Sequence, residues 1–316
     1  MKVLVTGASG FVGAALLTKL SEIGCDTLGA FRFFVPTLVA GAKGVVVGDL
    51  GDSQEWRAAL IGVATVVHTA ARVHVMSDKC SDSLREFRRV NVDGTATLAY
   101  QAAAAGVKRF VYLSSIKVNG EFTEKGKFFT ADDKPAPEDP YGVSKYEAEQ
   151  LLWKIGAETG MEIVVIRPPL VYGPGVKANF QSMLCWLARR FPLPLAALIH
   201  NRRSLVALDN LVDLIVTCIF HSAAANQIFL VSDGEDLSTA QLLMRIGSAM
   251  GTSVRLFYLP SPLLKLGATL LNKRGVYQRL CGSLRLDISK TKQLLGWAPP
   301  LSVDEGLRRT AEGFSP

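Results

Sequence analysis

Short runs of apolar, β-branched residues alternate with longer segments of helical spacing over about the first 170 residues of the chain. Apolar positions recur at helical spacing over residues 12–23, 83–105 and 141–159. Strands that alternate with helices in this way build parallel sheets with helices on both faces. The pattern therefore predicts an α/β protein with a doubly wound parallel sheet. The predicted strands are residues 2–6, 26–31, 44–48, 65–68, 109–114 and 162–167.

The pattern changes after Pro168-Pro169, where prolines and pairs of arginines become frequent and the strict alternation ends. Residues 227–232 again predict a strand, so we expect the chain to return to the sheet before it finishes in helices such as 238–250 and 288–295. This return to the sheet divides the smaller lobe into two segments of sequence. We expect one domain to comprise residues 1–170 and 205–234, and the smaller C-terminal lobe to comprise residues 171–204 and 235–316.

The composition is that of a globular protein, with 316 residues of which 49% are hydrophobic and 20% charged. Charged residues interrupt the longest apolar runs, so no segment predicts a membrane span. The N-terminus lacks the features of a signal peptide, and we place the protein in the cytoplasm. The five cysteines are far apart and form no cluster with histidine, which predicts neither disulfides nor a metal site.

The formal net charge is +7 at pH 7. A basic protein of this kind can bind nucleic acid or a membrane surface, but the chain has no long block of lysine and arginine and no basic run interleaved with aromatic residues. We therefore expect no nucleic acid partner and no membrane insertion. An anionic small-molecule substrate is the simpler explanation of the charge.

A glycine-rich turn joins the first predicted strand to the first predicted helix. Backbone amides and a helix N-terminus at such a turn can bind a pyrophosphate, and glycines allow its close approach. A turn that needs positive φ would also explain the glycines, but the strand before and the helix after favour a Rossmann-type dinucleotide site. The expected cofactor contacts in this turn are Gly7, Ser9, Gly10, Phe11, Val12 and Gly13.

The end of the second predicted strand bears on the choice of cofactor. NAD-preferring sites usually have an acidic residue there, whereas this strand ends in Arg32. Because an arginine can pair with a 2′-phosphate, we favour NADP(H), with NAD(H) as the alternative and a solvated loop cation as the ordinary explanation of Arg32. After the third strand, Asp49 and its neighbour Leu50 are candidates for contact with the adenine, although Asp49 also suits a plain turn.

Three residues carry the candidate chemistry. Tyr141 and Lys145 are one helical turn apart, so their side chains share a face. A tyrosine base needs a nearby cation, because a free phenol is hardly ionised at neutral pH. Ser115 ends the fifth strand, at the carboxyl edge where open α/β sheets bind ligands. Each residue alone has an ordinary structural explanation, but together they predict proton transfer coupled to hydride transfer.

A serine hydrolase is a competing hypothesis, but the chain has no G-x-S-x-G elbow and its histidines have no evident nucleophile partner. His68 closes a strand, which suggests a structural role. The small residues after it, Thr69, Ala70 and Ala71, would let the cofactor lie close to the chain. His74 is a candidate for the substrate pocket, with an ordinary loop residue as the alternative.

Five motifs in order resemble the extended short-chain dehydrogenase/reductase superfamily, and specifically its NAD-dependent epimerase/dehydratase family, which acts on nucleotide sugars. The resemblance covers nearly the whole chain. The motifs are Thr6-Gly7-Ala8-Ser9-Gly10-Phe11-Val12-Gly13, Val67-His68-Thr69-Ala70-Ala71, Asn91-Val92-Asp93-Gly94-Thr95, Tyr141-Gly142-Val143-Ser144-Lys145 and Arg167-Pro168-Pro169-Leu170-Val171-Tyr172-Gly173-Pro174-Gly175.

The resemblance assigns roles to individual residues. Ser115 matches the family's catalytic serine or threonine, and Asn91 matches a residue that supports the active-site lysine through water. Pro168, in the last motif, is an expected cofactor contact. The resemblance also implies a substrate diphosphate held by Asn179 and Arg203, with Arg279 as a second clamp. Arginine suits that role because it forms charge-assisted contacts with phosphate.

The chain departs from the family pattern after the serine, where Lys117 precedes Val118-Asn119-Gly120 in place of the common Val-Tyr-Gly. The acidic pair that family dehydratases carry at this point is replaced by Ile116 and Lys117, which argues against dehydration. The resemblance is strongest to the epimerases and 4-keto reductases of bacterial O-antigen synthesis, and it implies a homodimer formed through the helices of residues 83–105 and 141–159.

Four functions follow as hypotheses. The favoured one is NADPH-dependent reduction of a UDP-4-keto-6-deoxy-N-acetylhexosamine at C4, in the synthesis of an O-antigen or polysaccharide precursor. A UDP-hexose 4-epimerase with tightly bound NAD is close behind it. A non-catalytic NADP-sensing protein is disfavoured by the intact Tyr141 and Lys145. A carbonyl reductase of the steroid or flavonoid type would lack a diphosphate clamp.

Overall fold

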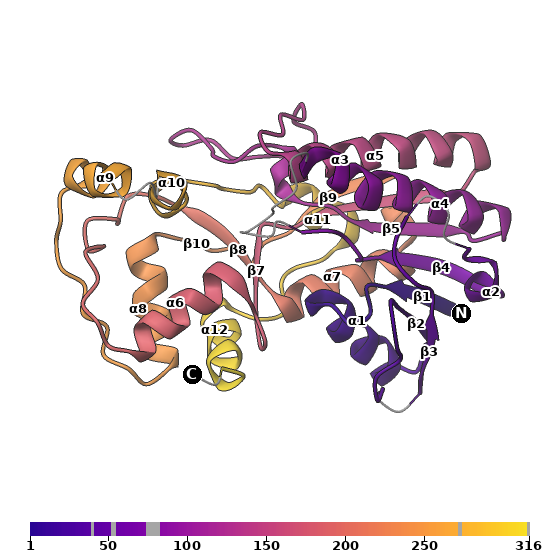
Figure 1. Cartoon of the computed structure of the whole chain (residues 1–316), viewed down its shortest axis with the longest axis horizontal. Coiled ribbons are helices and arrows are strands. Elements are labelled where there is room, and N and C mark those ends of the chain that lie inside the picture. The colour runs from indigo at the N-terminus through magenta and orange to yellow at the C-terminus, as the bar shows by residue number, and fades with distance from the viewer. Residues whose placement is uncertain (39–40, 52–54, 74–82, 271–273, 315–316) are drawn as a thin grey trace.

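The computed structural model describes residues 1–38, 41–51, 55–73, 83–270 and 274–314. Its centre is a seven-stranded sheet in the order β3-β2-β1-β4-β5-β6-β9, in which every neighbouring pair is parallel (Figure 1). The α/β doubly wound fold class predicted from the pattern is confirmed. The strands are β1 (Lys2–Thr6), β2 (Asp26–Phe31), β3 (Ala42–Val46), β4 (Val63–His68), β5 (Arg109–Leu113), β6 (Glu162–Arg167) and β9 (Gln227–Leu230).

Helices cover both faces of this sheet, as Figure 1 shows. On one face, α1 (Phe11–Glu22) and α7 (Leu208–Phe220) pack their leucines and isoleucines against the strands. On the other face lie α4 (Gly94–Ala104) and the long α5 (Pro140–Thr159). Because both faces are covered, the central strands are apolar on both sides. In β1, for example, Val3, Leu4 and Val5 are completely buried.

The order of the sheet creates a switch point beside its first strand. β1 and β4 are neighbours in the sheet. From the carboxyl end of β1 the chain continues to β2 on one side, whereas from the carboxyl end of β4 it continues to β5 on the other side. Ligands of open α/β sheets bind in the crevice that forms there. The glycine-rich turn follows β1 directly, at this crevice.

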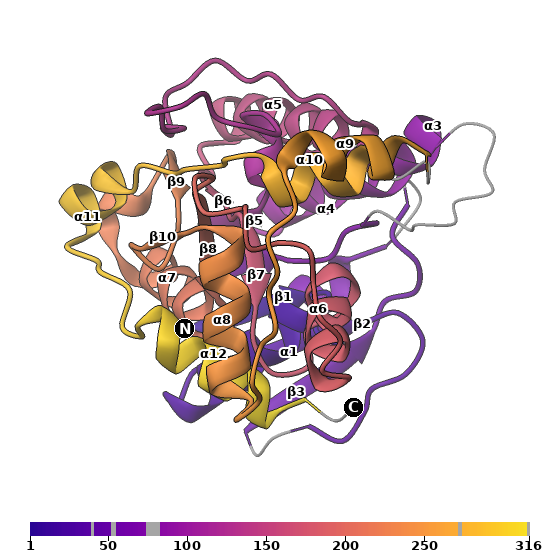
Figure 2. The same cartoon turned by 90° about the vertical axis from the view of Figure 1, so that its left-hand side faces the viewer.

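A second sheet of three short strands has the order β10-β8-β7, with bounds Leu170–Tyr172 for β7, Arg203–Ala207 for β8 and Asp236–Leu237 for β10. It packs with α6 (Ala178–Ala188), α8 (Thr239–Ala249) and α12 (Val303–Glu312) around a third apolar cluster. Figure 1 shows these helices grouped at the end of the molecule away from the N-terminus, and in Figure 2 this end faces the viewer. Short strands and mixed spacing explain why the hydrophobic pattern did not predict this sheet.

The remaining elements are short. They comprise α2 (Arg57–Leu60), α3 (Ser83–Arg88), the π-helical turn η1 (Arg89–Asp93), the 3-10 turns η2 (Ile116–Val118) and η3 (Ser222–Ala224), α9 (Ser261–Leu270), α10 (Arg274–Cys281) and α11 (Ser289–Leu295). Among the described residues, no helix is both long and apolar enough to cross a bilayer.

Most predicted elements lie within two residues of the observed ones. The expected return of the chain to the sheet is confirmed, because β9 pairs with β6. One prediction was too simple. The helix expected over residues 83–105 is divided into α3, η1 and α4, with a π-helical turn at Asn91. Such turns often occur at functional sites, and helical spacing alone does not distinguish them from a continuous helix. The division into two lobes remains a prediction.

Candidate active site

The turn after β1 is shaped for close contact with another backbone. Gly7 has a φ of +66°, and a Cβ there would lie 2.7 Å from the amide nitrogen of Ala70. A Cβ on Gly13 would lie 2.1 Å from the carbonyl oxygen of Gly7. Larger residues are therefore excluded at both positions, and the first turn of α1 approaches the end of β1 closely.

The N-terminus of α1 is open to an anion. Its N-cap is Gly10, which has no side chain to cap the free amides, and the first turn contains no acidic residue. Unpaired helix N-terminal amides attract phosphate. Across the turn, Thr69 donates to the carbonyl oxygen of Thr6 at 2.7 Å, which fixes the segment Thr69 to Ala71 beside the glycines. This turn thus fits the pyrophosphate of a dinucleotide.

His68 has two threonine partners and no contact with a candidate nucleophile. Its Nδ1 lies 2.7 Å from the hydroxyl of Thr6, and its Nε2 lies 3.0 Å from the hydroxyl of Thr95. Burial lowers the pKa of His68 to about 3, and the Lys145 cation adds to this effect. A neutral imidazole therefore links β1, β4 and α4, in keeping with the structural role expected for it.

Two predicted cofactor residues lie together at the end of β2. Arg32 Nε is 3.4 Å from Asp49 Oδ1, and the Arg32 guanidinium lies 5.4 Å from the centre of the Phe33 ring. Arg32 also lines a cavity of about 400 Å³ that extends along Ser9 and the start of α1. This cavity joins the glycine turn to the tip of β2, where the adenosine end of a dinucleotide binds in this type of fold. Leu50 packs against Gly94 at the start of α4.

Tyr141 and Lys145 lie on the first two turns of α5. The helix begins at Pro140, and Asp139 caps it by accepting a hydrogen bond from the amide of Gly142 at 2.6 Å. Lys145 Nζ lies 5.9 Å from the centre of the Tyr141 ring and donates to the carbonyl oxygen of Leu113 at 2.8 Å. The helix therefore presents the phenol and the ammonium together at the carboxyl end of β5.

Burial controls the acidity of both groups. It lowers the pKa of Lys145 to about 7, while the Glu149 carboxylate acts in the opposite direction. Burial also raises the pKa of Tyr141, and the charge of Asp139 raises it further. A phenol in this setting needs additional positive charge before it can act as a base. Lys145 supplies part of that charge, and the oxidised nicotinamide ring would supply more.

Ser115 follows β5 and starts the turn η2. Its backbone is extended, and its Oγ accepts a hydrogen bond from the amide of Lys117 at 3.3 Å. Lys117 Nζ in turn lies 2.5 Å from Asp139 and 2.8 Å from Glu121. A Cβ on Gly142 would lie 2.9 Å from the Lys117 carbonyl oxygen, so η2 and the start of α5 are in direct contact. The structure thus fixes Ser115 next to the turn that carries Tyr141.

Asn91 and Pro168 support this arrangement through other residues. Asn91 is buried in the π-helical turn and donates to the hydroxyl of Ser144, the residue before Lys145, at 3.0 Å. It also exchanges two hydrogen bonds with the backbone of Arg72. The carbonyl oxygen of Pro168 accepts from the amide of Ile116 at 3.0 Å. The expected action of Asn91 on the lysine through water remains a prediction.

A buried ion pair beneath the site was not predicted. Glu149 and Arg167 are 2% exposed or less and form two hydrogen bonds, at 2.5 and 3.0 Å. Ser114 donates to Glu149 at 2.5 Å, and Arg167 donates to Asn119 at 2.9 Å. The spacing Tyr141, Lys145, Glu149 places all three side chains on one face of α5, which was the signal available in the sequence.

The predicted substrate residues meet only in part. Arg203 Nη1 donates to the carbonyl oxygens of Arg279 and Gly282, at 3.1 and 3.2 Å, so the two predicted clamp arginines lie near each other. Burial lowers the pKa of Arg203, the Arg279 cation acts in the same direction, and Glu121 opposes them. Asn179 is exposed at the start of α6. His74 lies outside the described residues.

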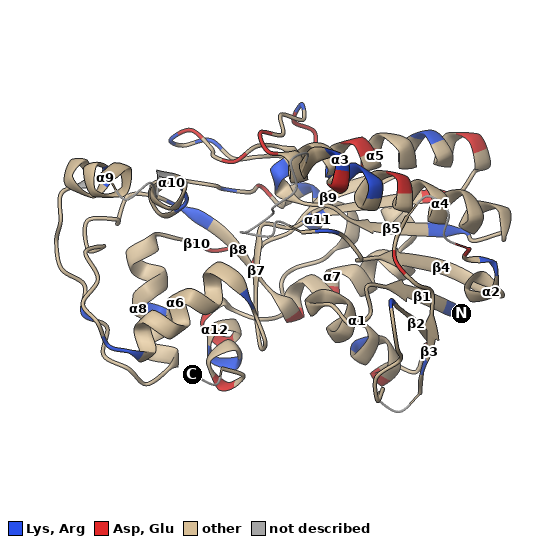
Figure 3. Ribbon diagram, in the orientation of Figure 1, with Lys and Arg blue, Asp and Glu red and all other residues tan. Residues whose placement is uncertain are grey.

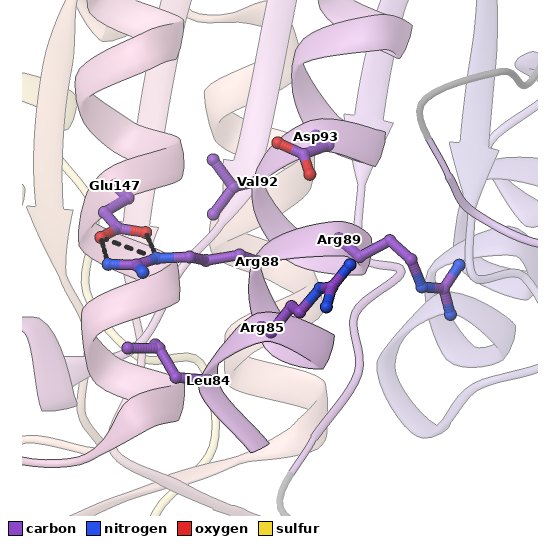
Figure 4. Close-up of a pocket in the computed structure, with 7 residues that line it drawn as sticks. All are labelled: Leu84, Arg85, Arg88, Arg89, Val92, Asp93 and Glu147. Atoms are coloured by element: carbon purple, nitrogen blue, oxygen red, sulfur yellow. Dashed lines mark hydrogen bonds and ion pairs between the residues drawn. The ribbon is translucent and has the colours of Figure 1, made fainter. Parts of the chain in front are cut away.

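Another cavity, of about 590 Å³, lies on the surface formed by α3, η1 and α5 (Figure 4). Arg88 and Glu147 form a bidentate ion pair across it, with contacts of 2.6 and 2.9 Å. It contains none of the predicted site residues, and so we do not assign the active site to it. Its lining residues are Leu84, Arg85, Arg88, Arg89, Val92, Asp93 and Glu147.

Known proteins resemble the chain over nearly its full length. It is 46% identical to a protein of Vibrio cholerae described as a UDP-glucose 4-epimerase, over 99% of this chain and 95% of the relative. It is 28% identical to an Escherichia coli O157:H7 protein described as an N-acetyl-alpha-D-glucosaminyl-diphospho-ditrans,octacis-undecaprenol 4-epimerase, over 98% and 94% of the two chains.

Solved structures share the fold. The structure of MoeE5 in complex with UDP-glucose and NAD superimposes with a TM-score of 0.79 and 24% identity, over 99% of this chain and 98% of that one. A UDP-glucuronic acid 4-epimerase from Bacillus cereus in complex with NAD gives a TM-score of 0.78 at 21% identity, over 99% and 96%. At this level of identity the likeness establishes the architecture alone.

The model of the NAD dependent epimerase/dehydratase family matches residues 3–232, which include the glycine turn, Ser115, Tyr141 and Lys145. The match confirms the family that the five motifs indicated. The chain is therefore an enzyme that uses a nicotinamide cofactor, and it belongs to the NAD dependent epimerase/dehydratase family.

Proposed function

We propose that the protein is a UDP-hexose 4-epimerase of the UDP-glucose or UDP-N-acetylglucosamine type. The observation that carries the proposal is its likeness, over almost the whole of both chains, to the Vibrio cholerae relative described as a UDP-glucose 4-epimerase. This reverses the order of the two leading hypotheses drawn from the sequence, in which the reductase came first. The site supports both, because each couples proton transfer at the C4 oxygen of the sugar to hydride transfer at C4: epimerisation first removes the proton, and reduction adds it.

In this proposal Tyr141 exchanges a proton with the C4 oxygen, and Ser115 orients that oxygen by a hydrogen bond. Lys145 lies one turn from Tyr141 and stabilises the phenolate, which burial and the Asp139 charge would otherwise disfavour. With a pKa near 7, Lys145 also changes charge within the working range of pH. Bound NAD would accept a hydride from C4 and return it to the opposite face of the ring.

The chain holds the cofactor through groups described above. The glycine turn and the uncapped start of α1 would bind the pyrophosphate, Thr69 to Ala71 would adjoin it, and Pro168 would contact the nicotinamide end. Asp49, which lies 3.4 Å from Arg32, would accept hydrogen bonds at the adenosine end. That ion pair reduces the positive charge that Arg32 could offer to a 2′-phosphate, which favours NAD.

We assign the substrate to the smaller lobe, comprising residues 171–204 and 235–316, and the cofactor to residues 1–170 and 205–234. Arg203 and Arg279 would bind the diphosphate of the nucleotide sugar, with Asn179 beside it. Two guanidinium groups at one site fit a dianionic pyrophosphate. We also assign the surface formed by α3, α4 and α5 to a homodimer interface, which light scattering of the purified protein would test.

A second candidate is the reduction of a UDP-4-keto-6-deoxy-N-acetylhexosamine by NADPH. The observation in its favour is Arg32, which lines the cavity at the tip of β2 and replaces the acidic residue typical of NAD-binding members. An epimerase regenerates its cofactor within each turnover, whereas a reductase must exchange it. The two functions therefore differ in how tightly the dinucleotide is held.

The deciding experiment has two parts. The purified protein is first denatured, and any released dinucleotide is identified by absorbance and mass. The native protein is then mixed with UDP-glucose or UDP-N-acetylglucosamine without added cofactor, and the C4 epimer is followed by NMR. About one NAD per chain together with epimer formation supports the proposal. An empty site that binds NADPH in preference to NADH, with no epimer formed, contradicts it and supports the reductase.

A further inference from the structure

Helices α9 and α10 form a hairpin on the outer surface of the molecule, at the opposite end from the N-terminus (Figures 1 and 2). They contact each other more than they contact any other element. None of their described side chains is fully buried. The end of α10 is attached to the body, because Thr239 and Asn201 donate to the carbonyl oxygen of Leu280 at 2.6 and 3.1 Å.

The outer helix α9 carries an apolar face with no partner among the described residues. Leu263, Leu266 and Leu270 follow the i, i+3, i+7 spacing of one helix face, and they are 52%, 56% and 78% exposed. A face of this kind ordinarily packs against the core. Tyr258, in the segment that leads into α9, is 72% exposed as well. The hairpin therefore displays large apolar side chains away from the rest of the chain.

The charge of the chain is concentrated around this hairpin. Residues 237–286 contain seven lysines and arginines and no aspartate or glutamate. The formal count balances over the rest of the chain, but two of these cations pair with acidic residues outside the segment, Arg245 with Glu235 and Arg285 with Asp236. Figure 3 shows no acidic residue on α9 or α10. Arg255 and Lys265, neither of which we assign to the substrate site, are exposed within the segment.

We propose that the α9–α10 hairpin docks onto the surface of an anionic lipid bilayer. Exposed leucines on one helix face insert at the boundary between headgroups and acyl chains, and neighbouring lysines and arginines pair with lipid phosphates. Other partners fit less well. A second copy of the hairpin would bring like charges together. Nucleic acid would satisfy the basic residues but would leave the leucine face in water.

The test is flotation of the full-length protein with lipid vesicles. We expect the protein to float with vesicles that contain phosphatidylglycerol, to remain in solution with pure phosphatidylcholine, and to be released in part when salt rises from about 0.1 M to about 0.5 M. Replacing two exposed leucines, in Leu266→Glu/Leu270→Glu, should weaken binding by roughly 10-fold or more, because apolar insertion is lost and charge repulsion is added. Lys265→Ser should weaken it less.

Matched controls separate this role from folding and from catalysis. Ile61→Glu changes an exposed apolar residue outside the hairpin and should leave flotation unchanged. The thermal melting temperature and the turnover of a soluble substrate should also be unchanged in the leucine variant, since the replaced side chains are exposed. The inference does not depend on which reaction the enzyme catalyses. Failure of the wild-type protein to bind anionic vesicles overturns it, as does equal binding by the leucine variant.

Discussion

At the scale of single residues, the site consists of ordinary groups whose acidity is changed by burial. Lys145 is 2% exposed and its pKa falls to about 7. The pKa of Tyr141 rises for the same reason, helped by Asp139. Because desolvation lowers the pKa of an ammonium and raises that of a phenol, it moves the two pKa values apart and favours the neutral form of both groups. Ionisation of the Tyr141 phenol therefore requires additional positive charge near it, which an oxidised nicotinamide ring would supply.

Replacing the phenol should stop the reaction without changing the fold. We expect Tyr141→Phe to lower kcat by about 10²- to 10⁴-fold, because a positioned acid or base contributes on this order. Tyr146→Phe, one residue beyond Lys145 on the same helix, is the matched control and should leave kcat nearly unchanged. The measurement is steady-state turnover of the substrate. Comparable rates for Tyr141→Phe and the wild type would exclude Tyr141 as the acid/base.

The buried lysine also makes stability depend on pH. Its pKa is lowered from 10.5 to about 7, so between these values the unfolded chain binds the proton that the folded chain has lost. Stability therefore rises with pH over this window, and the cost of burying the cation is fully present only below about pH 7. We expect the wild type to gain stability relative to Lys145→Met as pH rises from 7 to 10. Melting temperatures of both proteins at several pH values test this, and a difference independent of pH would contradict it.

At the scale of elements, the N-terminal cap and the buried face of α5 hold Tyr141 and Lys145 in position against the sheet. Asp139 caps the helix just before Tyr141 and pairs with Lys117. Almost three turns after the cap, Glu149 joins α5 to β6 through Arg167. The helix is therefore fixed at its start and along its length. Small displacements of Tyr141 are limited as a result.

Variants of the cap residue separate stability from electrostatics. Asp139→Ala should lower the free energy of unfolding by about 1 kcal/mol, whereas Asp139→Asn should keep most of the cap, because asparagine is an equally good N-cap. Both remove the charge that raises the pKa of Tyr141. The acidic limb of the pH–rate profile should therefore move to lower pH in both variants. A shift in the alanine variant alone would mean that the cap, not the charge, controls the limb.

The buried ion pair should be costly to break and less costly to replace. Glu149→Gln leaves the Arg167 cation buried without its counter-ion, and we expect it to lower the free energy of unfolding by about 3–5 kcal/mol. The double variant Glu149→Gln/Arg167→Met removes both charges and should recover part of that loss. Urea denaturation of the wild type and the variants measures this. Equal losses in the single and double variants would show that the pair itself contributes little.

At the scale of the whole molecule, segments distant in sequence meet at the proposed substrate site. Arg203 starts β8 in the second sheet, and its guanidinium contacts the backbone of Arg279 and Gly282, more than 70 residues further along the chain. Ser115 and Tyr141 come from the large sheet and its helix. A nucleotide sugar that reached from the serine to the arginines would therefore bridge the two sheets.

This bridging predicts a thermal effect of the free nucleotide. UDP should raise the melting temperature, because a ligand that binds only the folded state stabilises it. The increase should disappear in Arg203→Met and persist in Arg202→Met, which replaces a neighbouring arginine that donates to the backbone carbonyl oxygens of Ile199 and Asn201. Thermal shift measured against UDP concentration tests this. Loss of the response in both variants would assign the effect to net charge and not to Arg203.

The sequence by itself determined the sheet, the glycine turn and the pair of Tyr141 and Lys145. All three depend on local rules, namely apolar periodicity, the need for glycine at a close approach, and the spacing of one helical turn. Residues as far apart as Gly7 and Ser115 could be placed at one edge because parallel strands bring their carboxyl ends together. The family motifs then added roles that no local pattern contains.

Only the tertiary structure decided how distant side chains pair. The ion pairs Lys117–Asp139 and Glu149–Arg167 depend on the packing of η2, α5 and β6, and Arg32–Asp49 depends on how the segments after β2 and β3 approach each other, which periodicity does not encode. The π-helical turn at Asn91 and the three-stranded second sheet were missed for the same reason, because they are short and depend on contacts with other elements. The leucines of α9 have the spacing of a helix face that packs against a core, and only the exposure of their side chains in the structure shows that this face points to solvent.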